Sequence, residues 1–228
     1  MIKHVTYTND LMTISADRCR QSALRFGADE SEIVRREDIS TDSYPYNLGH
    51  VCDYWAWKSR IIVKEMNSLG EGDFLVYSDA GIEFLDDIRH VVCEMTDDFM
   101  FFSNGWKHSE WCKMDVFKAV GVEPGEEKQV QASLIFFRKS KKSVDFVIEW
   151  MNLCHTPNLI DDSPSIATNV PTFAAARHDQ SIIATLAVKY GIPLHWYPVT
   201  TAYHIKGDYP NDLYPCIALH HRKRNNEW

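Results

Sequence analysis

Apolar runs and amphipathic stretches alternate along the chain, a pattern that is typical of an α/β fold. Short apolar runs predict strands at 3–8, 33–36, 74–77, 99–102, 130–138 and 216–219. Apolar residues at helical spacing predict helices at 10–26, 54–69, 108–120, 142–153 and 181–190, with 84–93 helical or irregular. Gly70, Gly121 and Gly191 are expected to end three of these helices. A polar stretch at 158–173 predicts a long ordered loop near a site.

The apolar run at 74–77 ends abruptly at Ser78-Asp79-Ala80-Gly81. Open α/β sheets bind ligands outside the carboxyl ends of their strands, so Asp79 is predicted at such an end. A carboxylate there suits a hard divalent cation that also binds substrate phosphates. The alternative is a turn residue whose carboxylate accepts hydrogen bonds from backbone amides, and spacing alone favours neither interpretation.

Composition limits the class of protein. With 228 residues the chain is long enough for one domain with a full core, and a net charge of −8 disfavours a nucleic-acid partner. No apolar run is long enough for a membrane span, and the first ten residues lack the apolar core of a signal peptide. Six scattered cysteines without a CxxC pair argue against a zinc site and for a reducing compartment. We therefore expect a soluble, cytoplasmic protein.

Two polar clusters adjoin predicted elements. The first, Arg177-His178-Asp179-Gln180, precedes the helix at 181–190, where Asp179 has an ordinary explanation as a helix N-cap. The second, 220–224, follows the last strand and contains two histidines and three cations. Strand side chains alternate, so at most one of His220 and His221 faces a given site, where its imidazole could complete a Mn²⁺ shell begun by Asp79. The cations could neutralise a diphosphate, or the cluster could be a solvated surface.

Five segments together resemble one family. They are Trp55-Ala56-Trp57-Lys58, Leu75–Gly81, Gln131–Ser140, Arg177–Ser181 and His220–Arg224. In this order and spacing the chain resembles small glycosyltransferases of the GT-A fold, which occur in polysaccharide gene clusters and in large viruses that glycosylate their own capsids. The resemblance spans nearly the full chain. It implies one Rossmann-like α/β domain over residues 1–228, with a mixed, mostly parallel central sheet flanked by helices. It also implies a location in the cytoplasm or, for a virus, in the host cytoplasm.

The resemblance implies a metal site. Asp79 stands where the family has its DXD motif, but Gly81 replaces the second acid. A shell of Mn²⁺ or Mg²⁺ would then need Asp79, His220 or His221, donor phosphate oxygens and water. Glu83 is a substitute ligand or an exposed surface glutamate.

The resemblance also implies a donor site. Its residues are Thr6, Tyr7 and Thr8 at the nucleotide base, Lys58 and Arg60 at the diphosphate or sugar, and Arg222 at the leaving group. The alternatives are a buried strand end for the first three, and a lysine that extends along the flank of a helix whose tryptophans belong to the core. By resemblance, UDP is favoured over GDP.

Asp179 and Gln180 are the expected catalytic residues. Asp179 would act as a base if the sugar's configuration inverts, or would position the acceptor and stabilise the ion if it is retained; Gln180 could instead face the sugar, and the pair resembles retaining members. Gln131 would contact the acceptor or donor sugar, with a polar residue at the start of a strand as the equal alternative. Trp106 and Trp111 could stack on a saccharide acceptor or pack in the core. Two other classes stay open: a non-catalytic carbohydrate-binding domain, favoured by the missing acid, and a nucleotidyl transferase or phosphodiesterase.

Overall fold

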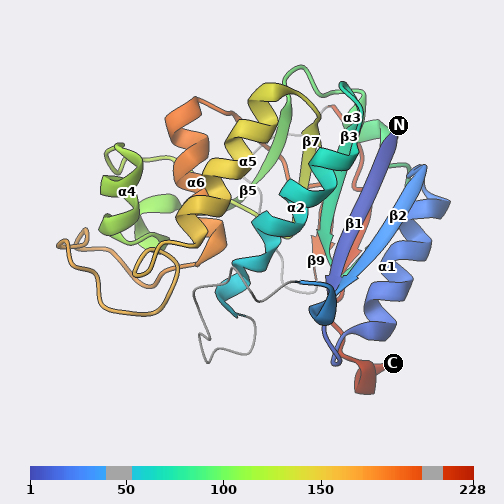
Figure 1. Ribbon diagram of the computed structural model, residues 1–228, viewed down its shortest axis with the longest axis horizontal. Coiled ribbons are helices and arrows are strands. Elements are labelled where there is room, and N and C mark those ends of the chain that lie inside the picture. Colours follow the sequence, from blue (N-terminus) through green and yellow to red (C-terminus); the bar gives the residue numbers. More distant parts are fainter. Residues whose placement is uncertain (40–52, 202–212) are drawn as a thin grey trace.

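A seven-stranded mixed sheet forms the centre of the computed structural model, which describes residues 1–39, 53–201 and 213–228 (Figure 1). Its main path runs β2 (Glu30–Arg35), β1 (Ile2–Thr8), β3 (Phe74–Asp79), β7 (Leu134–Arg138), β5 (Phe99–Lys107) and β6 (Lys128–Val130), and β8 (Leu194–His195) also pairs with β5. The pairings give β1, β2, β3, β5 and β8 one direction, and β6 and β7 the opposite one. The predicted α/β class is confirmed.

Six α-helices accompany the strands in the described parts of the chain. They are α1 (Thr13–Arg25), α2 (Trp57–Ser68), α3 (Arg89–Val92), α4 (Met114–Val120), α5 (Lys141–Cys154) and α6 (Asp179–Tyr190). Single 3₁₀ turns lie at Arg36–Asp38, Asp53–Trp55, His108–Trp111 and Asn225–Glu227. Gly121 and Gly191 end α4 and α6 in the left-handed conformation, as predicted. Within the described ranges, no helix has both the length and the apolar composition needed to cross a membrane.

The central strands are buried on both faces, which explains their continuous apolar runs. Leu75 and Tyr77 of β3 join an apolar cluster with α2, α5 and α6, whereas Val76 between them joins a second cluster with α1. The same alternation recurs in β5 and β7, because successive strand side chains point to opposite faces. Figure 1 shows α2 and α5 lying together across one face of the sheet, and α1 beside β1 and β2. This packing fixes the ends of β1 and β3, where polar residues follow.

A second, three-stranded sheet brings the end of the chain to the end of β3. Its order is β4 (Ile82–Phe84), β10 (Ala218–His220) and β9 (Val199–Thr201). β10 is antiparallel to β4, with His220 opposite Ile82, and the amide of His221 donates to the carbonyl of Gly81 at 2.9 Å. The last strand therefore begins two residues and ends one residue later than the predicted 216–219, and it ends near Asp79.

The predicted strand at 130–138 is two strands, β6 and β7, separated by a turn at 131–133. At the middle of that turn, the backbone of Ala132 bonds to side chains. The amide of Ala132 donates to Gln180 Oε1 (3.2 Å), and its carbonyl accepts from Lys58 Nζ (2.9 Å). Tertiary contacts with polar side chains therefore override the local apolar pattern.

The predicted helix at 108–120 is likewise divided into a 3₁₀ turn and α4. Lys113 at the break has an extended backbone and is buried, with its ammonium held by the carbonyl of Asn158 (2.9 Å) and by Asp161 Oδ1 (3.1 Å). Both partners belong to the loop at 158–173, which contains neither helix nor strand, as predicted. Residues 84–93, predicted as helical or irregular, complete β4 and form the short helix α3.

Candidate functional site

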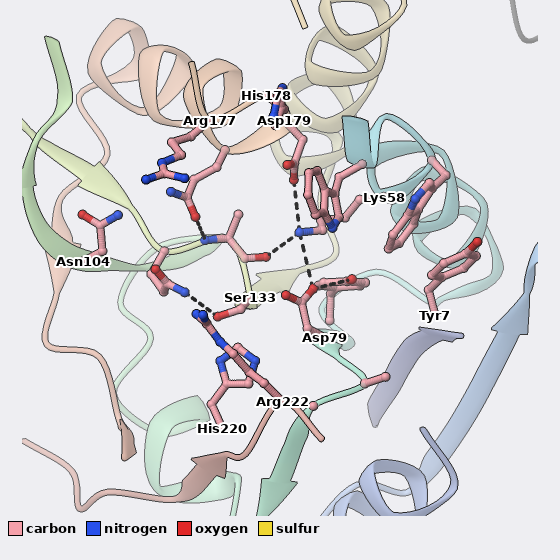
Figure 2. Close-up of a pocket in the computed structure, with 18 of the residues that line it drawn as sticks. Tyr7, Lys58, Asp79, Asn104, Ser133, Arg177, His178, Asp179, His220 and Arg222 are labelled. Atoms are coloured by element: carbon pink, nitrogen blue, oxygen red, sulfur yellow. Dashed lines mark hydrogen bonds and ion pairs between the residues drawn. The ribbon is translucent and has the colours of Figure 1, made fainter. Parts of the chain in front are cut away.

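A pocket of about 660 Å³ opens where β1 and β3 end, beside the first turn of α6 (Figure 2). Its lining comes from segments far apart in sequence: Tyr7, Asn9, Met12, Trp55, Trp57, Lys58, Tyr77, Asp79, Ala80, Gly81, Asn104, Trp106, Trp111, Gln129, Gln131, Ala132, Ser133, Arg177, His178, Asp179, Gln180, His220 and Arg222. Members of all five segments that carry the family resemblance meet here. In the described residues, three cations and two carboxylates line the pocket of a chain whose net charge is −8.

Lys58 joins the two carboxylates of the pocket. Its ammonium lies 3.1 Å from Asp179 Oδ2 and 3.5 Å from Asp79 Oδ1, and it donates to the carbonyl of Ala132 at 2.9 Å. It also lies 5.1 Å from the centre of the Tyr77 ring. Lys58 and Asp179 are only 3% and 4% exposed, so their charges are held by each other rather than by water. Lys58 therefore does not extend from the flank of α2 into solvent, which was the alternative interpretation.

Burial and charge act against each other within this group. Burial alone would lower the pKa of the Lys58 ammonium, but Asp179 and then Asp79 outweigh it and raise that pKa above its ordinary value. For the Asp179 carboxyl, burial exceeds the opposing effect of Lys58 and raises the pKa to about 6. Both groups are therefore charged at neutral pH, and Asp179 protonates more readily than an ordinary aspartate.

Asp179 is the first residue of α6, and His178 occupies the N-cap position without a capping side-chain bond. The carboxylate of Asp179 instead faces Lys58 (Figure 2). One hydrogen bond links α5 to this end of the helix: Trp150 Nε1 donates to the carbonyl of Asp179 at 3.1 Å. Asp179 is thus placed in the pocket by the packing of α5 against α6.

Asp79 ends β3, as predicted, and its side chain is 31% exposed in the pocket. Tyr77, two residues earlier on the same face of the strand, donates its hydroxyl to Asp79 Oδ1 at 2.8 Å. Burial, and then the charge of Asp79, raise the pKa of that hydroxyl, so Tyr77 remains a donor. One carboxylate oxygen is therefore directed towards Tyr77 and Lys58, a role different from that of a simple turn residue.

His220 and Arg222 lie across the pocket from Lys58 (Figure 2). His220 is buried, which lowers the pKa of its imidazole to about 4, and Nδ1 has no hydrogen-bond partner. His221 is not part of the lining: its ring packs edge-on against Trp228, with centroids 4.8 Å apart. Strand alternation thus directs one histidine to the pocket and the other away, as predicted.

Gly81 allows the end of β10 to lie close to the end of β3. A Cβ at this position would be 3.1 Å from both Cα and N of Arg222, and 3.2 Å from Cδ2 of His220. Backbone atoms yield less readily than the end of a flexible side chain, so a larger residue at this position would push the chain end away. Glycine therefore lets His220 and Arg222 lie close to the end of β3.

Asp79 and His220 are the residues present that suit a divalent cation. A neutral imidazole with an unpartnered nitrogen is the form of histidine that binds metals, and a carboxylate suits Mn²⁺ and Mg²⁺. Within residues 1–39, 53–201 and 213–228, no three His, Cys, Asp or Glu side chains gather to hold a metal by themselves. Glu83 is no substitute, because Arg18 holds its carboxylate at 2.9 Å. These residues fit a metal that shares its shell with ligand oxygens, not one caged by protein.

The opposite wall near β1 is aromatic. Tyr7 stacks on Trp57 with ring centroids 3.8 Å apart and both rings line the pocket. Thr6 and Thr8 were also predicted to contact the nucleotide base. Both are buried and do not line the pocket, since strand alternation turns their side chains to the other face of β1. Arg60, two residues beyond Lys58 on α2, also lies outside the lining.

Amides form a connected network between the catalytic candidates and β5. Gln180 Nε2 donates to Gln129 Oε1 (2.9 Å), which also accepts from Asn104 Nδ2 (3.1 Å). Gln131 Nε2 donates to Ser133 Oγ at 2.7 Å. Asn104, Gln129 and Ser133 were not among the predicted site residues. A signal existed for Asn104, which follows a buried apolar run after one serine, just as Asp79 does.

The backbone is strained around the pocket. Five residues other than glycine have positive φ in the described chain: Tyr54, Trp55, Asn158, His178 and Arg222. Three of them, Trp55, His178 and Arg222, line the pocket. Such conformations cost about 1–3 kcal/mol each and concentrate at functional sites. Strain, buried charge and an aromatic wall thus coincide in one pocket at the strand ends of an α/β protein.

No family model matches the chain, and no curated protein matches it either.

Proposed function

We propose that this protein is a GT-A-type glycosyltransferase that moves a sugar from a nucleoside-diphosphate donor, with UDP favoured, to a hydroxyl of a saccharide, with retention of configuration. The observation that carries the proposal is the meeting of Lys58, Asp79 and Asp179 within 3.5 Å contacts at the strand ends, opposite His220 and Arg222. Glycosyl transfer needs cations at the leaving diphosphate and a carboxylate near the reacting carbon. This pocket offers both.

The aromatic wall of the pocket and the direction of the strands in the central sheet support the same proposal. The stacked rings of Tyr7 and Trp57 offer an aromatic surface for a nucleotide base beside the carboxyl end of β1. The sheet is mixed, with most strands in one direction, which agrees with the GT-A expectation. Ligands of open α/β sheets bind at such strand ends.

The reaction breaks the bond between the anomeric carbon and a diphosphate oxygen, which leaves with the electron pair. A bond forms between that carbon and the acceptor oxygen, and the acceptor proton passes to the leaving diphosphate if configuration is retained. Asp79 and His220 would hold Mn²⁺ or Mg²⁺, which supplies positive charge to the diphosphate when bound. Lys58 and Arg222 add further positive charge, and Asp179 positions the acceptor and stabilises the developing cation of the sugar.

Transfer itself is the test. The protein is incubated with Mn²⁺, a panel of UDP- and GDP-sugars and a panel of oligosaccharides, and products are detected by mass spectrometry. An oligosaccharide heavier by one sugar, formed by the wild type and not by Asp179→Asn, supports the proposal. Hydrolysis without transfer, or no reaction of any donor with any acceptor, contradicts it.

One observation favours a second function, a carbohydrate-binding domain without activity. The motif at β3 has a single acid, and no metal cage exists among the described residues. This alternative predicts that the wild type binds oligosaccharides, has no affinity for UDP in the presence of Mn²⁺, and forms no product in the transfer experiment.

A further inference from the structure

The end of the pocket farthest from Tyr7 has a distinct chemistry. It contains Trp106, Trp111 and Arg177, which we call the Arg177 platform. Figure 2 shows Arg177 and Asn104 on the opposite side of the pocket from Tyr7, with Lys58 and the two carboxylates between them. The platform therefore lies beyond the charged centre, at the position left for a second ligand once a nucleotide occupies the Tyr7 wall.

Trp106 offers an unusually open aromatic face. Its side chain is 58% exposed, and it meets Trp111 edge-on with ring centroids 5.6 Å apart and planes at 71°. The backbone is fixed by the bond from the Trp106 amide to Asn104 Oδ1 at 3.0 Å. Exposed aromatic surface beside a cleft is typical of ligand-binding grooves. A pyranose ring, with an apolar face and a polar edge, matches such a surface.

Arg177 carries a charge that has no acidic partner among the described residues. Its Cζ lies 4.2 Å from the centre of the Trp111 ring, and no carboxylate of the described residues forms an ion pair with it. Other arginines do have such partners, as Arg138 has Asp98 at 2.9 Å. Stacking uses the flat face of the guanidinium and leaves the N–H donors in its plane available. The group is thus oriented for an incoming anion before binding.

The position of Arg177 argues against a role at the donor diphosphate. Figure 2 shows Arg177 apart from Lys58 and the two carboxylates. Lys58 instead bonds to the carbonyl of Ala132 at 2.9 Å, whose amide donates to Gln180 Oε1 at 3.2 Å, and Gln180 in turn bonds to Gln129. An anion at Arg177 therefore belongs to a different part of the bound molecules than an anion at Asp79 and His220.

We infer that the Arg177 platform binds an acidic saccharide, whose sugar ring stacks on Trp106 and whose carboxylate, sulfate or phosphate pairs with the Arg177 guanidinium. If the protein is the proposed transferase, this saccharide is its acceptor, and that assignment rests on the proposed function. Bidentate pairing with a carboxylate or phosphate is the geometry in which arginine differs most from lysine. In a chain of net charge −8, attraction of an anionic glycan must be local, and Arg177 supplies it.

The test measures binding to an immobilised panel of neutral, uronic-acid-containing, sulfated and phosphorylated oligosaccharides, at several salt concentrations. We expect the wild type to prefer acidic members, with the preferred class identifying the anion. Arg177→Gln should lose about tenfold or more in affinity for those members alone, the scale of a contact between charged groups. Arg177→Lys should recover only part of it, and Trp106→Ala should weaken neutral and acidic members alike. Lys118→Gln, which removes an exposed charge on α4 outside the pocket, is the matched control.

Equal binding of neutral and acidic oligosaccharides by the wild type would overturn the inference, as would equal losses for both in Arg177→Gln, or no binding to any member. A parallel titration of the wild type with UDP and Mn²⁺ separates this result from the proposed function. Acidic saccharide binding without UDP binding or transfer removes the transferase and leaves the platform. UDP binding and transfer without a preference for acidic saccharides removes the platform alone.

Discussion

Lys58 determines the charge balance of the pocket at the scale of single residues. It is buried, and its ammonium contacts Asp179, Asp79 and the carbonyl of Ala132. Burying one charge beside two opposite charges leaves an excess negative charge, which a divalent cation or a positively charged transition state would neutralise. Burial raises the pKa of Asp179 to about 6, against the opposing effect of Lys58. The chemistry of the pocket thus depends on a carboxylate that is close to its titration range.

Asp179→Asn tests this role. The change keeps the shape of the side chain and removes its charge, so we expect turnover to fall by about 100-fold or more while UDP binding in Mn²⁺ changes little. Asp145→Asn removes a carboxylate that is 58% exposed on α5 and should leave both quantities unchanged. Initial rates and calorimetric titrations of the two variants give the comparison. Wild-type turnover in Asp179→Asn would remove Asp179 from the reaction.

The pH dependence follows from the raised pKa of Asp179. Its folded-state pKa of about 6 lies above the ordinary value of 3.8, so the carboxyl gains its proton as pH falls through about 6. If the charged form is required, kcat should decrease below pH 6 and be level above it. The measurement is a kcat profile from pH 5 to 8 at saturating Mn²⁺, with protein stability recorded at each pH. A profile that is level down to pH 5 contradicts the requirement.

Gly81→Ala tests the close approach of the chain end to β3. The new Cβ would lie 3.1 Å from two backbone atoms of Arg222, so β10 must move away and carry His220 with it. We expect the affinity for UDP in Mn²⁺ to fall by about tenfold, or 1.4 kcal/mol, with the fold retained. Gly70→Ala is the control, because its Cβ would meet only the flexible carboxylate of Asp73. Unchanged UDP affinity in Gly81→Ala would mean that the approach does not matter for the donor.

At the scale of elements, α5 positions the first turn of α6. Trp150 is fully buried, and its indole N–H donates to the carbonyl of Asp179. The bond links the core of the α2–α5–α6 layer to the catalytic candidate. Helix packing, rather than any local motif, therefore determines where Asp179 lies.

Trp150→Phe should lower the free energy of unfolding by about 1–3 kcal/mol, because it removes the indole hydrogen bond and leaves unfilled space around a fully buried side chain, and should lower turnover as well. Trp106→Phe changes a 58% exposed ring and should leave the free energy of unfolding within about 0.5 kcal/mol of the wild type. Urea titrations measure both. Equal stability of Trp150→Phe and the wild type would show that the hydrogen bond from Trp150 to the carbonyl of Asp179 contributes nothing to the free energy of unfolding.

The elements that could be predicted from the sequence are those that depend on local signals rather than on contacts between distant segments. Buried strands such as 74–77 and helices ended by Gly121 or Gly191 carry local signals, and these predictions were confirmed. The turn at 131–133 and the break at Lys113 could not be predicted, because both depend on side chains distant in sequence. Asp79 and His220 followed from alternation and strand ends, whereas the Gln129–Asn104 network needed the register of β5 and β6.

At the scale of the whole molecule, the pocket differs from the acidic chain as a whole, because its described lining has more cations than carboxylates. Three cations and two carboxylates line it in the described chain, and its two ends differ, with stacked Tyr7 and Trp57 at one and the Arg177 platform at the other. Such an arrangement suits two ligands that meet at the charged centre. The order of the ligands along the pocket, nucleotide at Tyr7 and saccharide at Arg177, is the central claim about function.

The most direct test of this claim is a calorimetric titration of the wild type with UDP and GDP, each in Mn²⁺ and in EDTA, alongside Asp79→Asn. The account predicts that UDP binds at least about tenfold more tightly in Mn²⁺ than in EDTA, a difference of about 1.4 kcal/mol, and that Asp79→Asn loses this difference. If neither nucleotide binds to the wild type in Mn²⁺, the donor site and the transferase are contradicted.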